Sequence, residues 1–131
     1  MPLPGHEPSL DDLQAMAEEA FAGLPEEFRE LTGDIVFMVQ DFPDSEMRAG
    51  LKLKTGYELL GLFHGSPLAA REANRGRPDP TMIFLFRRPI LNYWRSEGGT
   101  LMEIVRHVLI HEIGHHFGLS DADMEAIEAE D

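Results

Sequence analysis

A helical pattern between residues 100 and 117 sets the frame for the whole chain. Thr100 and Glu103 have the Thr-x-x-Glu spacing of a capping box, in which the two side chains satisfy backbone N–H groups at the start of a helix. Apolar residues then recur on one helix face: Leu101, Ile104, Val105, Val108 and Leu109. Gly118 follows at a suitable place for a C-terminal cap. A helix with so wide an apolar face needs other elements to cover it.

Three short apolar segments are suited to cover that helix as a sheet. They are rich in β-branched and aromatic residues and are bounded by turn-forming residues: 35–39, 59–63 and 82–86. A second amphipathic helix is predicted after Ser9, which would cap it, and Gly23-Leu24-Pro25 ends it. The predicted fold class is α+β: a small twisted sheet of about three strands packed on the long helix, with an N-terminal helix.

The remaining segments indicate one domain across residues 1–131, because no linker is long enough to separate two. Proline-rich residues 1–8 are expected to form a loose arm, and residues 71–80 an exposed loop. Pro89 suits the first turn of a short helix through Trp94. Residues 121–130 are expected to form a final acidic helix or a frayed tail.

Charge and composition narrow the classes of partner. The net charge is −13, with −11 in residues 1–46, +4 in residues 47–112 and −6 in residues 113–131. So acidic a surface disfavours nucleic acid and anionic membranes, and no apolar run approaches the ~18–20 residues of a membrane span. Without a leader-like start, the expected location is cytoplasmic and the default state a monomer. The chain has no cysteine, so any metal must bind to nitrogen and oxygen ligands.

Histidine and glutamate in the second half of the long helix have the pattern of a metal site. His111 and His115 are four residues apart, so both imidazoles project from one helix face and can bind one ion. Glu112 can accept a proton from a water at the open coordination position. After the turn at Gly118, Asp121 would supply an oxygen ligand. Two imidazoles and one carboxylate leave a fourth position for water, which is typical of catalytic zinc sites.

The stretch from His111 to Asp121 resembles the zincin metallopeptidases that have the motif His-Glu-x-x-His-x-x-Gly-x-x-Asp. The likeness to small bacterial zincin-like metallopeptidases extends over residues 84–90 and 103–121. The resemblance implies a Zn²⁺-dependent peptidase acting on a peptide or protein substrate. By position in the motif, it implies His111, His115 and Asp121 as zinc ligands and Glu112 as the general base.

The resemblance also carries expectations about the cleft. The segment 82–86 is expected to be the edge strand of the sheet, which pairs with an extended substrate by β-augmentation. Ten residues follow Asp121, so the second subdomain that forms the other wall of the cleft in larger zincins is expected to be missing.

Several side chains keep alternative roles. His107 is an alternative metal ligand or a neighbour of the site, and Asp123 is an alternative third ligand. Met124 is expected in the core of the last helix rather than under the metal. His116 points about 100° away from its neighbour on the helix and is expected to pack or lie at the surface. Four side chains are candidates for stabilising the oxyanion: Tyr57, Tyr93, His64 and Arg88.

Three functional hypotheses remain open at this point. The first is a peptidase, and the second is a zinc-binding module with little or no proteolytic activity that acts through partner binding. The third is a structural domain in which the histidines are merely buried. Five arginines around the predicted edge strand either favour acidic peptides or form a solvated rim: Arg71, Arg75, Arg77, Arg87 and Arg88.

Overall fold

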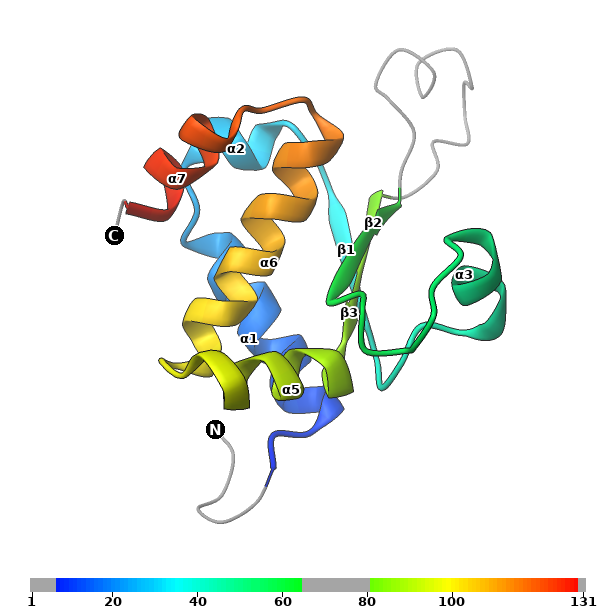
Figure 1. The fold of residues 1–131 in the computed structure, drawn as a ribbon. Helices are drawn as coiled ribbons and strands as arrows, with labels where there is room; N and C mark the ends of the chain where they lie inside the picture. Colours follow the sequence, from blue (N-terminus) through cyan, green and yellow to red (C-terminus); the bar gives the residue numbers. More distant parts are fainter. Residues whose placement is uncertain (1–6, 65–80, 130–131) are drawn as a thin grey trace.

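A computed structural model describes residues 7–64 and 81–129 of the chain. The elements follow in the order α1 (Leu10–Ala22), α2 (Glu26–Glu30), β1 (Ile35–Gln40), α3 (Ser45–Gly50), β2 (Gly61–His64), β3 (Thr81–Phe86), α5 (Arg87–Glu97), α6 (Leu101–His116) and α7 (Asp121–Ala129) (Figure 1). Helices combined with a three-stranded mixed sheet confirm the α+β class. The predicted loop at 71–80, with Arg71, Arg75 and Arg77, lies outside the described residues.

Both long helices begin with the caps that the sequence predicts. Ser9 and Asp12 exchange side-chain-to-backbone hydrogen bonds of 2.8 and 3.0 Å at the start of α1. Thr100 and Glu103 do the same at the start of α6, at 3.2 and 3.1 Å. These reciprocal bonds satisfy backbone donors that the first turn of a helix leaves open, so both helix starts are defined locally.

The strand order is β1-β3-β2, which corrects the expectation about the substrate-binding edge. β1 pairs in parallel with β3, from Ile35 opposite Thr81 to Gln40 opposite Phe86. β2 pairs antiparallel with the other side of β3, with Gly61 opposite Leu85. The segment 82–86 therefore lies in the centre of the sheet. Its backbone groups are engaged on both sides, so it cannot be the edge strand that accepts a peptide.

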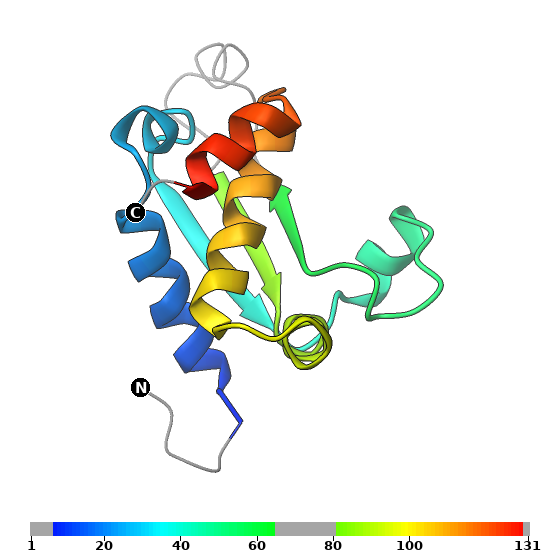
Figure 2. The same cartoon turned by 60° about the vertical axis from the view of Figure 1, so that its left-hand side comes forward.

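The helices α1 and α6 lie together against one face of this sheet (Figures 1 and 2). The core between the layers includes the fully buried side chains of Leu13, Ile83, Leu85 and Leu109. Helix α6 packs tightly on β2 at Gly61, where an added Cβ would lie 2.8 Å from Cγ1 of Val108. Glycine at this position lets the motif helix lie directly on an edge strand.

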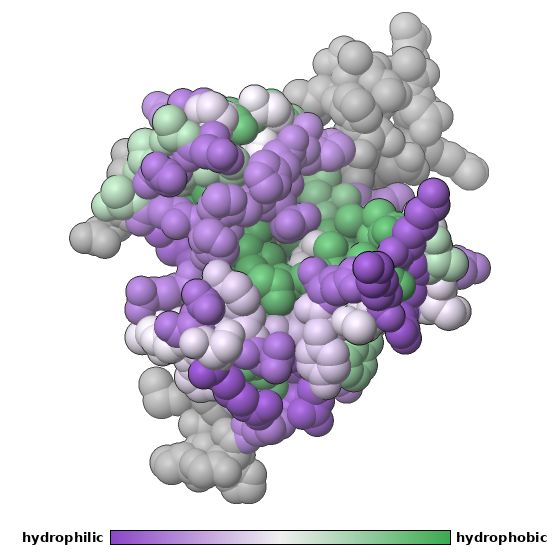
Figure 3. Space-filling model, in the orientation of Figure 1, coloured by the Kyte–Doolittle hydropathy of each residue, from purple (hydrophilic) through white to green (hydrophobic). Residues whose placement is uncertain are grey.

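The other face of the sheet is apolar and partly open. It forms a hollow of about 360 Å³ with α3, whose lining includes Met47, Leu62, Met82 and Phe84. Figure 3 shows apolar side chains gathered beside α3, whereas hydrophilic side chains cover the side of α6 and α7. The polar surface, on which a catalytic or metal site is expected, is therefore the one formed by α6 and α7.

Residues Glu7 and Pro8, at the end of the predicted N-terminal arm, are held by α5. Arg87 donates to the carbonyl of Pro8 at 2.6 Å and also pairs with Asp41 at 3.0 Å. Glu7 forms ion pairs with Arg87 and Arg88 at 3.4 and 3.2 Å, and with Arg95. Residues 1–6 of the arm lie outside the described part of the chain.

Among the residues that the structure describes, no helix is long and apolar enough to cross a membrane.

Candidate metal site

A stripe of three histidines runs along one face of α6. His107, His111 and His115 follow one another at intervals of one helical turn, as the sequence predicts. The ring centroids of His107 and His111 are 4.1 Å apart, and those of His111 and His115 are 5.7 Å apart. His115 is exposed, whereas the other two are half-buried. The stripe therefore offers two overlapping pairs of imidazoles, with His111 common to both.

The chain reverses direction after α6 at the predicted glycine. Gly118 has a φ of +75°, in the left-handed region. The N–H of Leu119 donates to the carbonyl of Gly114 at 2.9 Å, and the N–H of Gly118 donates to the carbonyl of His115 at 3.2 Å. This pair of bonds is a Schellman motif, which caps the helix and turns the chain back.

Helix α7 returns along α6 and is held in its first half and at its end. Met124 is fully buried, and its side chain occupies the space where a Cβ at Gly114 would lie. Near the end of α7, the guanidinium of Arg106 donates to the carbonyls of Ile127 and Glu128, each at 2.8 Å. Met124 is thus a core residue of the last helix. These contacts make α7 antiparallel to α6 and bring its last turn beside the histidine stripe.

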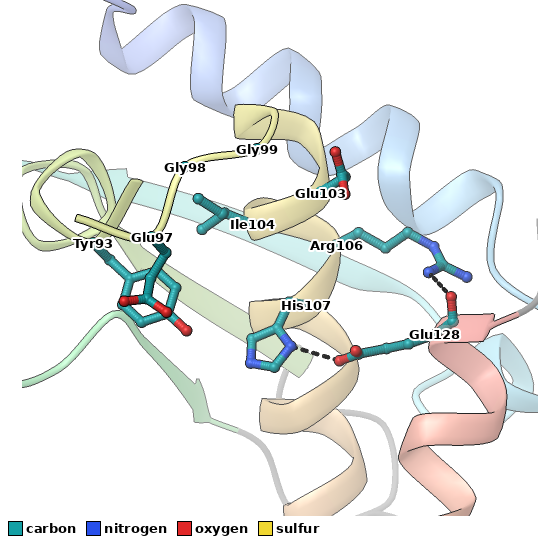
Figure 4. A pocket seen from close by; sticks show the side chains of 9 residues that line it. All are labelled: Tyr93, Glu97, Gly98, Gly99, Glu103, Ile104, Arg106, His107 and Glu128. Carbon is teal, nitrogen blue, oxygen red and sulfur yellow. Dashed lines mark hydrogen bonds and ion pairs between the residues drawn. The ribbon is translucent and has the colours of Figure 1, made fainter. Parts of the chain in front are cut away.

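The carboxylate of Glu128 completes a group of three potential metal ligands. Its Oε1 atom lies 2.6 Å from Nδ1 of His107 and 2.8 Å from Nε2 of His111 (Figure 4 shows the approach of His107). Among the described residues, this is the group of His, Asp and Glu whose ligand atoms all lie within 4.8 Å of one another. The same atom is sealed from solvent, and its contacts with the two imidazoles lack the alignment of regular hydrogen bonds.

This donor set fits a divalent cation. A buried carboxylate oxygen is costly unless a proton or a cation faces it, and a cation placed among two imidazoles and a carboxylate would have ligands that zinc prefers. The sequence pointed to His107 as an alternative ligand but not to Glu128. Glu128 lies 17 residues beyond His111, and only the return of α7 brings the two together.

Glu112 has the electrostatic character of a general base. Burial raises its pKa from 4.5 to about 7, because the charged carboxylate is poorly solvated beside the helix. A carboxylate with a pKa close to the working pH can both accept and return a proton. The histidines of the motif flank this group on α6.

The two aspartates that the sequence offers as a third ligand lie in the first turn of α7. Asp121 begins the helix and is exposed, and it is outside the group of ligand atoms formed with Glu128. Asp123 exchanges hydrogen bonds with Ser120, at 3.2 Å to the N–H of Ser120 and at 3.0 Å from its own N–H to the hydroxyl. Asp123 therefore caps α7, which makes it a poor candidate for a ligand.

The other side chains singled out from the sequence fall in different parts of the fold. His116 packs on Phe63 of β2, with ring centroids 4.1 Å apart, as expected for a packing residue. Tyr57 contacts Phe42 edge to face, and Arg88 pairs with Glu7. His64 ends β2 and is exposed. Of the oxyanion candidates, Tyr93 alone lines the pocket beside the histidine stripe.

Comparison with known proteins supports the interpretation of this region as a metal site. A family model described as a zincin-like metallopeptidase matches residues 32–130, a range that contains all three strands and the helices α3, α5, α6 and α7. No curated protein matches the chain.

Proposed function

Because the chain belongs to the zincin-like metallopeptidase family, we propose that it is a zinc-dependent peptidase. In this proposal His111, His115 and Asp121 hold the cation and Glu112 is the general base. The observation that carries the proposal is a half-buried glutamate, with a pKa raised to about 7, directly after the first of two imidazoles that share a helix face. Bound zinc would supply polarisation of the scissile carbonyl and a lowered pKa for a water molecule.

Glu112 would carry the proton through the reaction. Its carboxylate accepts a proton from the attacking water and passes it to the amine of the leaving peptide. A carboxylate with the ordinary pKa of 4.5 holds a proton too weakly to return it efficiently at neutral pH. The raised pKa of Glu112 therefore suits both halves of the transfer.

The substrate strand in this proposal is β2 rather than β3. Among the described strands β2 is at an edge of the sheet, and it lies against the motif helix. Phe63 of β2 contacts His116 directly. An extended peptide added to this edge would run beside α6, with its backbone hydrogen bonds supplied by β2 and alternate side chains facing the helix.

The test is a cleavage assay on a peptide library with the Glu112→Gln variant. The amide keeps the size of the side chain but cannot accept the proton, so we expect kcat/KM to fall roughly 100-fold or more, with zinc content unchanged. The matched control is Glu125→Gln, an exposed glutamate of α7 that should keep full activity. Full activity of Glu112→Gln would refute the mechanism. Stoichiometric zinc without cleavage of any peptide by the wild type would favour the zinc-binding module instead.

A further inference from the structure

We infer that His107, His111 and Glu128 form a second divalent-cation site, which competes with the motif pair for His111. The inference rests on the proposed function only in taking His111 and His115 as the catalytic pair. The second site lies one helical turn before that pair and takes its carboxylate from the end of α7.

The geometry of the three ligand atoms is close to that of a bound site. Zinc binds imidazole nitrogen and carboxylate oxygen at about 2.0–2.1 Å, which places tetrahedral ligands about 3.3 Å apart. The observed separations from Glu128 Oε1 are 2.6 Å to His107 and 2.8 Å to His111. The carboxylate would therefore withdraw by roughly 0.5–0.7 Å to admit the ion. A small change of side-chain torsion is enough for such a shift.

The backbone that carries Glu128 is positioned independently of the ligands. Arg106 binds the carbonyl of Glu128 itself, and Met124 anchors α7 one turn earlier against Gly114. A carboxylate supported in this way loses little freedom when it binds a metal, which is what a preorganised site requires. The same contacts hold the buried Oε1 atom of Glu128 beside the two imidazoles.

A pocket gives the second site access to solvent. The cavity has a volume of about 520 Å³ and is lined by His107 and Glu128 together with Tyr93, Glu97 and Glu103 (Figure 4). Tyr93 and Glu97 come from α5, and Glu97 is exposed, so the cavity reaches the surface on this side. A cation can reach the ligands through this cavity, where the carboxylates of Glu97, Glu103 and Glu128 outnumber the one guanidinium, that of Arg106.

Competition follows from the atom that His111 presents. Its Nε2 faces Glu128 in the structure. One nitrogen lone pair can bind one ion, so a cation held with His107 and Glu128 removes Nε2 of His111 from any cation held with His115. The protein can therefore hold one metal ion with either set of ligands but not with both. An ion bound by His107, His111 and Glu128 would leave His115 without His111 as its partner ligand.

Titration of the metal-free full chain with Zn²⁺ alone tests this inference by calorimetry. The wild type should bind one equivalent. The single variants His115→Ala and Glu128→Gln should each still bind one equivalent, because each keeps one ligand set. His111→Ala should bind none, because both sets depend on it. The double variant His115→Ala with Glu128→Gln should bind Zn²⁺ more than about 100-fold more weakly than His115→Ala, since a direct ligand is worth more than a supporting residue.

The control is Glu125→Gln in the His115→Ala background, which should keep its one equivalent because Glu125 is exposed on α7 and outside the ligand group. Circular dichroism checks that each variant is folded. Loss of all binding in His115→Ala alone would overturn the second site, and two equivalents in the wild type would overturn the competition. If Glu128→Gln alone loses all zinc while His115→Ala keeps it, the upstream site stands and the proposed catalytic pair fails.

Discussion

Replacing Gly114 with alanine is expected to destabilise the protein, although alanine normally stabilises the interior of a helix relative to glycine. An added Cβ would lie 2.8 Å from Cγ of Met124 and closer still to its Sδ, against a normal separation of about 3.5–4.0 Å between carbon atoms. Met124 is fully buried, so its side chain cannot relieve the contact by moving into solvent. The substitution therefore presses α7 away from α6.

The size of the effect follows from two opposing contributions. Alanine in place of glycine in a helix interior lowers the free energy of the folded state by about 1 kcal/mol. Overpacking a well-filled core costs about 1–3 kcal/mol, and the two close contacts favour the upper part of that range. The net loss of stability should be about 1–2 kcal/mol. In a Met124→Ala background the clash is absent, so the same Gly114→Ala change should stabilise by about 1 kcal/mol.

Urea unfolding of the four proteins in this double-mutant cycle measures the contact. The expected coupling between Gly114 and Met124 is about 2–3 kcal/mol. The matched control is Gly50→Ala at the end of α3, where an added Cβ meets nothing within 4 Å and no loss of stability is expected. If Gly114→Ala proves more stable than the wild type, α7 does not dock as described, and the position argued for Glu128 loses its support.

Two further predictions concern the pKa of Glu112 and the contact between α6 and β2 at Gly61. In the metal-free protein, burial raises the pKa of Glu112 to about 7, whereas in the unfolded chain this carboxyl group releases its proton near pH 4.5. The folded state therefore keeps a proton that the unfolded state loses, and the free energy of unfolding should fall by about 2 kcal/mol between pH 4.5 and 7. Glu112→Gln should lack this part of the slope in urea titrations at the two pH values, and an unchanged slope would contradict the raised pKa. Gly61→Ala should cost about 1–3 kcal/mol, because its Cβ would lie 2.8 Å from Cγ1 of Val108 and 3.0 Å from the carbonyl oxygen of Phe84; thermal unfolding measures the loss, and a Tm equal to that of the wild type would refute the close approach.

Those parts of the fold that depend on neighbouring residues could be predicted from the sequence. The caps at Ser9 and Thr100 and the turn at Gly118 all use atoms within a few residues of one another. The strands were predicted to within two residues, because runs of β-branched and aromatic side chains mark buried strands. The helix predicted for Pro89–Trp94 is longer, at Arg87–Glu97, and α3 was not predicted. A helix of six residues has little periodicity to detect, although its Asp44 cap is visible.

Sheet order could not be predicted in the same way. Whether β3 pairs on one side or on two depends on which strands meet across the long connections between them. The segment 82–86 is apolar, and an apolar segment can be either a central or an edge strand, so its own residues do not distinguish the two positions. The resemblance suggested an edge position, and the structure places β2 there instead. A signal did exist in β2: Gly61 within a strand is typical of close backbone approach, and here the approaching element is the motif helix.

The position of α7 explains how the three histidines of α6 could serve the two proposed metal sites. Met124 must face α6, and helical periodicity places Asp121, three residues before it, and Glu128, four residues after it, near the same face. Seven residues of helix separate these two carboxylates by about 10 Å, which is close to the distance between the first and last histidines of the stripe. Because α7 runs antiparallel to α6, Asp121 lies toward the His115 end and Glu128 at the His107 end. If both proposals hold, a single helix docked through Met124 and Arg106 supplies Asp121 to the pair His111–His115 and Glu128 to the pair His107–His111.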